Sequence, residues 1–282
     1  MGAKLLFVVS HPDYGEELWR SDGTAAGTKR VKEINPGADS HPSYLTPMKI
    51  GTKHILFFRA YDSVHGAELW RSDGTAAGTK LVSDIVPGGG FSAPSDLRVM
   101  KIGTKRMLFF RADDGTSGEE LWRSDGTAAG TKRVKDINPG TANSFPGDFT
   151  VMKVGTKRVL FFAASDGTSG RELWRSDGSG AGTRRVKDIT AGGDGSTPSE
   201  LVVMKVGTRQ LLYLRASDAG GGSELWRSDG TKSGTRLAAD IVPGAGGSDP
   251  YGFTVMKVGR RPVLFFGATD GSSGYELWRY RP

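Results

Sequence analysis

The chain repeats itself with a period of about 52 residues, and this periodicity constrains its fold more than any other feature. The sequence Glu-Leu-Trp-Arg occurs six times, and a methionine keeps the same spacing from Met48 to Met256. The six tryptophans of the motif are Trp19, Trp70, Trp122, Trp174, Trp226 and Trp278. Because one unit recurs along the whole chain, we expect a single repeat domain over residues 1–282.

One repeat contains four short runs of β-forming residues separated by glycine-containing turns. In the segment from Phe149 to Ile189 these runs are Phe149–Val154, Arg158–Ala164, Glu172–Ser176 and Thr183–Ile189. Glycine turns between β-rich runs favour hairpins, and four antiparallel strands per repeat are typical of a β-propeller blade. The sequence therefore predicts an all-β fold, a single β-propeller of four-stranded antiparallel blades.

The number of strands does not divide evenly into blades. The chain begins at a second strand, Lys4 to Val9, and ends after a third strand, Glu276 to Tyr280. This gives twenty-two strands, two more than five blades require and two fewer than six require. We favour five blades with the termini meeting in one shared blade, and the alternative is six blades of which two are incomplete. The surplus terminal hairpin would then be available to pair with another chain.

The longest connection, from Ile189 to Leu201, is expected to join the outer strand of one blade to the inner strand of the next. Both hairpins of each blade then lie on one rim, and the interblade links and the loops after the second strands lie on the other. The hairpin rim is predicted to be basic through Lys53, Lys105, Arg106, Lys157, Arg158, Arg209, Arg260 and Arg261. The opposite rim carries Asp62, Asp114, Asp166, Asp218 and Asp270.

The rim opposite the hairpins is also where the repeats differ most from one another. Variable loops on a constant frame are a usual place for recognition. The candidate ligand-binding residues there are Tyr44, Phe91, Asp96, Phe145, Asp148, Glu200 and Tyr251. The aromatic members have the rings needed to stack on sugars, and the alternative is that they simply cover the rim.

No constellation of residues indicates catalysis. The four histidines lie in the first quarter of the chain without metal-ligand spacing, and the chain has no cysteine. No phosphate-binding loop or nucleophile elbow occurs in the sequence. We therefore expect a protein that is not an enzyme and needs no cofactor or metal. The aspartates of Asp-Gly pairs such as Asp177-Gly178 are expected to form turns, and the motif tryptophans to pack between blades.

The segment Glu17-Leu18-Trp19-Arg20-Ser21-Asp22-Gly23-Thr24 resembles the bacterial ELWxxDGT repeat family. The fourth copy has Ser179 in place of the threonine, and the sixth copy is truncated after Tyr280. The resemblance covers the whole chain and implies a repeat architecture and a secreted or cell-surface location, but no activity. The chain itself shows neither a signal peptide nor an apolar run long enough to span a membrane.

Our leading hypothesis is a non-catalytic scaffold that binds a glycan or a protein through repeated sites on the loop rim. The alternatives are a structural spacer or display element, including a recently amplified or engineered array, and an enzyme. The basic rim has the charge to attract polyanions, or serves solubility alone. Nucleic acid is disfavoured as a partner because exposed aromatic residues are not interleaved with the basic ones.

Overall fold

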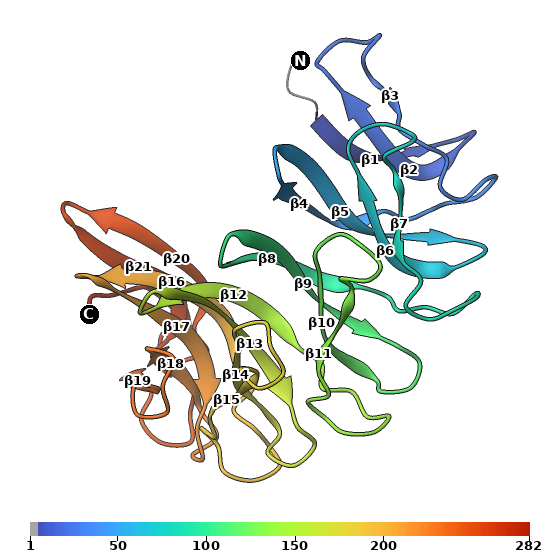
Figure 1. The fold of residues 1–282 in the computed structure, drawn as a ribbon. Coiled ribbons are helices and arrows are strands. Elements are labelled where there is room, and N and C mark those ends of the chain that lie inside the picture. The colour runs from blue at the N-terminus through green and yellow to red at the C-terminus, as the bar shows by residue number, and fades with distance from the viewer. Residues whose placement is uncertain (1–4) are drawn as a thin grey trace. The chain divides into compact units, whose positions relative to one another are not determined.

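The computed structural model describes residues 5–282, which form strands, turns and loops without any helix. The chain divides into two compact units, Met1–Arg133 and Val134–Pro282, and each is described by itself. Figure 1 shows that both units are built from small antiparallel sheets that follow one another along the chain. The all-β class predicted from the sequence is confirmed.

The first unit holds three sheets, of which the first has three strands and the others have four. Their strands, in chain order, are β1 (Leu5–His11), β2 (Gly15–Ser21), β3 (Lys29–Arg30), β4 (Ser43–Ile50), β5 (Lys53–Asp62), β6 (Gly66–Ser72), β7 (Lys80–Ser83), β8 (Ser95–Ile102), β9 (Lys105–Asp113), β10 (Glu119–Ser124) and β11 (Lys132–Lys135). The boundary between the units falls inside β11.

The second unit also holds three sheets, and its last sheet has three strands. Their strands are β12 (Gly147–Val154), β13 (Lys157–Ser165), β14 (Arg171–Ser176), β15 (Arg184–Lys187), β16 (Ser199–Val206), β17 (Arg209–Ser217), β18 (Ser223–Ser228), β19 (Arg236–Ala239), β20 (Tyr251–Val258), β21 (Arg261–Thr269) and β22 (Tyr275–Tyr280). The predicted total of twenty-two strands is therefore found within residues 5–282. The described residues form six sheets, the first and the last with three strands each, and closure into five blades stays a prediction.

The outer strands are shorter than the sequence predicts. The predicted run Thr183–Ile189 is a strand only over Arg184–Lys187, and its pairing with β14 shifts register between Leu173 and Trp174. The strand ends at Lys187, and the N–H of Ile189 bonds to the buried carboxylate of Glu172 at 3.1 Å. A side chain of the motif thus ends the strand and starts the link to the next sheet.

Consecutive sheets within a unit pack face to face through the same residue positions. The sheet β4–β7 contributes Met48, Phe57 and Leu69 to one buried cluster. The sheet β8–β11 contributes Leu108 and Trp122 to that cluster. We call the side of a sheet equivalent to Met48 and Leu69 its forward face, and the side equivalent to Leu108 and Trp122 its backward face. The same arrangement recurs in the second unit. The predicted packing of the motif tryptophans between sheets is confirmed for Trp70, Trp122 and Trp226. Trp19 instead lies on the outer side of the first sheet and is only partly buried.

In three Glu-Leu-Trp-Arg motifs the arginine, Arg20, Arg71 or Arg175, ties its sheet to the Asp-Gly turn of the next. Arg20 donates to the carbonyl oxygen of Gly74, and Arg71 donates to that of Gly126, both at 2.7 Å. These glycines belong to the Asp-Gly turn of the following sheet and have positive φ, 82° at Gly74 and 93° at Gly126. A Cβ on Gly126 would lie 2.9 Å from both Ile50 and Phe57 of the preceding sheet, so glycine is needed for the close approach.

The motif glutamates Glu17, Glu68, Glu172 and Glu224 anchor the links between sheets. Glu68 is fully buried and accepts backbone N–H groups from Ile85, Val86 and Ser92, each at 3.2 Å. Its carboxylate also accepts the hydroxyl of Ser92. Burial raises the pKa of Glu68 above its ordinary value, against the lowering effect of these hydrogen bonds. The link is therefore held by a buried carboxylate rather than by strand pairing.

Candidate functional site

A cavity lies at the hairpin rim between two adjacent sheets of the first unit. It has a volume of about 500 Å³ and opens between the β4–β5 and β8–β9 hairpins. Its cationic lining residues are Lys49, Lys101, Lys105 and Arg106, and its one carboxylate is Asp125 of the Asp-Gly turn after β10. The lining joins both kinds of hairpin, as expected if both lie on one rim.

The equivalent cavity occurs in the second unit, at the positions 104 residues further on. It has a volume of about 410 Å³ and is lined by Lys153, Arg209, Gln210, Asp229 and Thr231, among others. Gln210 replaces Arg106 of the first cavity, and its side-chain oxygen accepts the N–H of Lys153 at 2.6 Å. The sequence analysis predicted the basic rim but missed these cavities, because they form only where one repeat meets the next.

A third cavity, of about 390 Å³, lies beside the last one and is bounded by three arginines. Arg209, Arg227 and Arg236 line it together with Asp229. In the preceding sheet, the pKa of Arg175, the residue equivalent to Arg227, is lowered by burial and by neighbouring Arg184. Three guanidinium groups lining one cavity favour the binding of an anion there.

The carboxylates that line these cavities are engaged in their own turns. Asp125 accepts the N–H of Thr127 at 3.0 Å and its hydroxyl at 2.6 Å. Asp229 makes the same two bonds to Thr231. The predicted turn role of the Asp-Gly aspartates is confirmed, and the bonds satisfy much of their acceptor capacity. In each cavity the cationic lining side chains outnumber the carboxylates.

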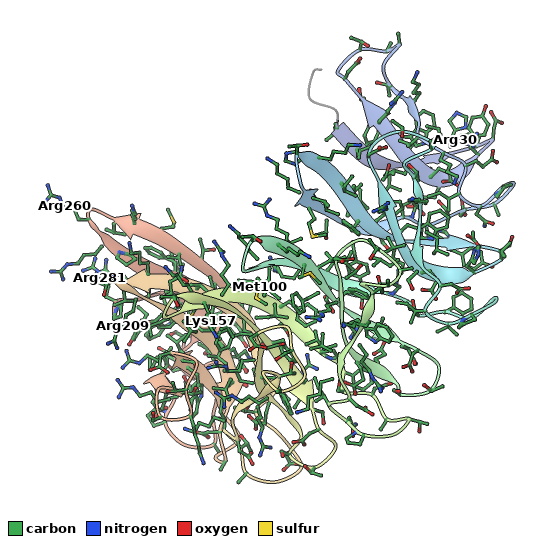
Figure 2. All side chains as sticks on the ribbon, viewed as in Figure 1. Arg30, Met100, Lys157, Arg209, Arg260 and Arg281 are labelled. Carbon is green, nitrogen blue, oxygen red and sulfur yellow. The ribbon has the colours of Figure 1, made fainter. Side chains whose placement is uncertain are left out.

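All of the predicted basic-face residues are exposed at the hairpins. Figure 2 shows Lys157, Arg209 and Arg260 at the hairpin end of the second unit, with Arg260 at the tip of the β20–β21 hairpin. Two of the lysines also act on turn aspartates of their own sheets. The pKa of Asp73 is lowered by the Thr75 hydroxyl and, more weakly, by Lys53, while Lys157 contributes in the same direction at Asp177.

The opposite, loop rim carries non-glycine residues with left-handed backbone conformation at two repeated positions. The residue between the serine and proline of Ser-x-Pro has φ from 43° to 46° in all five copies. The residue three positions later has φ from 55° to 60° in the four copies where it is not glycine. These latter residues are Tyr44, Asp96, Asp148 and Glu200. A left-handed backbone is uncommon for residues other than glycine, because it strains them. These four predicted ligand-binding residues lie at a β-bulge where the inner strand of each sheet begins.

The predicted aromatic ligand residues are exposed, but each also contacts a neighbour. The guanidinium of Arg59 lies 5.3 Å from the ring centre of Tyr44. Phe91 stacks on Tyr61, with the ring centres 5.9 Å apart. Phe145 is 47% exposed, and its carbonyl accepts a hydrogen bond from Arg171.

Tyr251 has the most complete set of contacts among these aromatic residues. It packs edge to face on Tyr275, with the ring centres 5.5 Å apart, and its ring fills the space above Gly267. Gly267 stands at the position that Arg59 occupies in the first complete repeat, so the missing side chain makes room for the ring. The structure therefore gives Tyr251 a packing role alongside the exposed edge that a ligand would use.

The acidic candidates on the loop rim have backbone or arginine partners. Asp96 lies 3.8 Å from Arg111, and Asp148 lies 3.6 Å from Arg171. Glu200 accepts the backbone N–H of Gly252 at 3.0 Å in the next sheet. Each of these carboxylates therefore has a partner on the rim, and the charges of Asp96 and Asp148 are partly compensated by arginine.

The aspartates after the second strands cap their own loops. Asp166 accepts the N–H groups of Thr168 and Ser169, and its pKa is lowered although burial acts in the opposite direction. Asp62 instead bonds the ring of His65 at 2.9 Å and raises the pKa of that histidine. Within residues 5–282 no group of three or more His, Asp or Glu side chains is arranged to hold a metal ion.

The fold and the cavities define an all-β protein with propeller-like sheets and repeated cationic clefts. No family profile matches the sequence, and no curated protein matches it significantly. Among solved structures, the chain is similar to a puromycin-hydrolysing peptidase of Mycobacterium tuberculosis, with a TM-score of 0.60 and 13% identity over 100% of this chain and 43% of that one. It also matches TolB of Acinetobacter baumannii, with a TM-score of 0.42 and 15% identity over 97% of this chain and 65% of that one.

These similarities concern the fold alone. The chain spans less than half of the peptidase and about two thirds of TolB, at identities where function is not transferred. A sialidase of Trypanosoma rangeli is also similar, with a TM-score of 0.40 and 11% identity over 97% of this chain and 51% of that one. Among the described residues, no helix has the length and apolar character to cross a membrane.

Proposed function

We propose that this protein is a non-catalytic scaffold that binds an acidic polysaccharide at its hairpin rim. The observation that carries the proposal is the recurrence of one cationic cavity, with matching lining positions, in both units. A repeated anionic polymer suits repeated sites, because several weak contacts along one chain add to a much higher overall affinity. An enzyme would instead need an asymmetric set of catalytic groups.

Binding of dextran sulfate, with neutral dextran as the uncharged control, tests this proposal. The charge reversal K105E/R106E should weaken binding by about tenfold or more, equivalent to about 1.4 kcal/mol. The matched control K80E/K132E makes the same change in net charge on exposed outer strands outside the cavity. Equal losses in both double variants, or equal binding of neutral dextran, would refute a specific site.

A second candidate site is the loop rim, where a glycan or a protein would contact Tyr44, Phe91, Asp96, Phe145, Asp148, Glu200 and Tyr251. The left-handed backbone at Tyr44 and its equivalents supports this site, because strain of this kind concentrates at functional positions. A glycan array that includes neutral sugars separates the two rims. Binding that is insensitive to salt and lost in Tyr44→Ala would place recognition on the loop rim.

A spacer without any ligand is the remaining alternative. Ligand-induced stabilisation in a thermal shift screen would count against the spacer.

We further propose that the chain is a member of the ELWxxDGT repeat family. The separate structural roles of the glutamate, leucine, tryptophan and arginine support this assignment, since together they explain why these four residue types recur.

A further inference from the structure

The last sheet exposes two apolar residues, Leu277 and Met256, whose equivalents are buried in every complete repeat. Leu277 on β22 is 78% exposed, whereas Leu225 and its four other equivalents are 0% exposed. Met256 on β20 is 56% exposed, whereas Met204 is 0% exposed. Together with Val258, which is 44% exposed, these residues form what we call the terminal forward face. Exposed large apolar residues that gather on one face of a sheet indicate an interaction surface.

The first sheet exposes the opposite face. Leu5 on β1 is 65% exposed, whereas its equivalent Leu108 on β9 is 0% exposed. Phe7 and Trp19 on the same side of this sheet are only partly buried, while the equivalent Phe110 is fully buried. We call the side that carries Leu5, Phe7 and Trp19 the terminal backward face.

These two faces are the two halves of an interface that the molecule already contains. Wherever consecutive sheets pack within a unit, a forward face covers a backward face, as Leu69 and Met48 do with Leu108 and Phe110. The same pairing joins Leu173 to Leu212 in the second unit. By this rule the surface that fits Leu277 is one that carries Leu5 and Phe7.

The polar contacts of the interface are also available on both faces. Arg279 occupies the position of Arg71 on the terminal forward face, and Gly23 occupies the position of Gly126 on the first sheet. Space beside Gly23 is open, with no atom within 4 Å of a Cβ placed there. The two groups that correspond to Arg71 and Gly126, the side chain of Arg279 and the backbone of Gly23, are therefore both exposed.

We propose that the terminal forward face of one molecule docks on the terminal backward face of a second copy. Leu277 would pack on Leu5 and Phe7, and Arg279 would donate to the carbonyl oxygen of Gly23. The contact uses different surfaces on the two molecules, so association continues head to tail unless it closes into a ring. This proposal is independent of polysaccharide binding, which takes place at the hairpin rim.

Sedimentation velocity over a wide range of protein concentration tests the docking. The unmodified protein should self-associate, and Leu277→Arg and Leu5→Arg should each abolish association. The control Val64→Arg places the same charge at an exposed apolar residue, 65% exposed, in the loop after β5, and it should associate like the unmodified protein.

Mixing the two disabled variants gives the sharper result. L5R keeps an intact terminal forward face and L277R keeps an intact terminal backward face, so an equimolar mixture should form dimers and nothing larger. Circular dichroism of each variant should match that of the unmodified protein, which separates lost docking from misfolding. The proposal is overturned if the unmodified protein stays monomeric, as it would with closure inside one chain, if L277R alone still dimerises, or if the mixture forms no complex.

Discussion

Replacing the buried glutamate of one motif by alanine should destabilise the protein far more than the same change at the sixth copy. Glu68 is fully buried and holds the link between two sheets through three backbone N–H groups and one hydroxyl. Glu276 occupies the equivalent position on β22 but is exposed. The same glutamate-to-alanine substitution can therefore be compared at a buried position and at an exposed one.

The magnitude follows from the four donors that Glu68→Ala leaves without their acceptor. A hydrogen bond to a charged group contributes about 1.5–3 kcal/mol, and partial hydration of the freed link recovers part of this. The desolvation cost of the buried carboxylate also disappears in the variant. We expect a net loss of about 3–5 kcal/mol, the range for breaking a buried charged network, against less than about 0.5 kcal/mol for Glu276→Ala.

Denaturant titration followed by tryptophan fluorescence measures both losses, because the motif tryptophans of neighbouring sheets report on packing. The two variants and the unmodified protein should be compared at one protein concentration. A loss below about 1 kcal/mol for Glu68→Ala would refute the anchoring role of the carboxylate. So would similar losses in the two variants.

Three further predictions use the repeat in the same way. The pKa of Glu68 is raised in the folded state, so the stability linked to its protonation is present below pH 4.5 and is lost as the pH rises through the folded-state pKa. Glu68→Gln should flatten this dependence in unfolding curves measured at a series of pH values, and an unchanged slope would contradict it. Leu173→Ala should cost about 2–5 kcal/mol and Leu277→Ala under about 1 kcal/mol at dilutions where the protein is monomeric, as measured by denaturant unfolding. Gly230→Ala should lower the melting temperature more than Gly23→Ala. Both glycines have positive φ, but only at Gly230 would the added Cβ lie 2.9 Å from a phenylalanine ring of the neighbouring sheet. Equal shifts would show that backbone strain alone is responsible.

Much of the architecture could be predicted from the sequence because it is local. Strands and Asp-Gly turns are specified by a few neighbouring residues. Because the repeats are nearly identical, a correct assignment of strands in one repeat applies to all of them. The sharing of one rim by both hairpins follows from antiparallel strand order, and the cavity lined by Lys105 and Asp125 agrees with it. The lengths of the outer strands could not be predicted, because Glu172 competes for the backbone of the link from a distant position.

The candidate sites were predicted less completely than the fold. Basic residues such as Lys105 and Arg106 were assigned to the correct rim, but the cavity around them requires the neighbouring repeat's Lys49. The left-handed conformation of Tyr44 and Asp96 has no sequence signal of its own, since neither residue type requires it. The packing of Tyr251 over Gly267 becomes recognisable only when the two strands are paired.

The sequence by itself determined the repeat, its strands, its turns and the chemical character of each rim. Only the tertiary structure decided that the same leucine is fully buried at Leu225 and exposed at Leu277. The local sequence around the two residues is nearly the same, Glu-Leu-Trp-Arg in both. Their difference arises because burial of a sheet face is supplied by a neighbouring sheet, which a residue's own repeat does not contain.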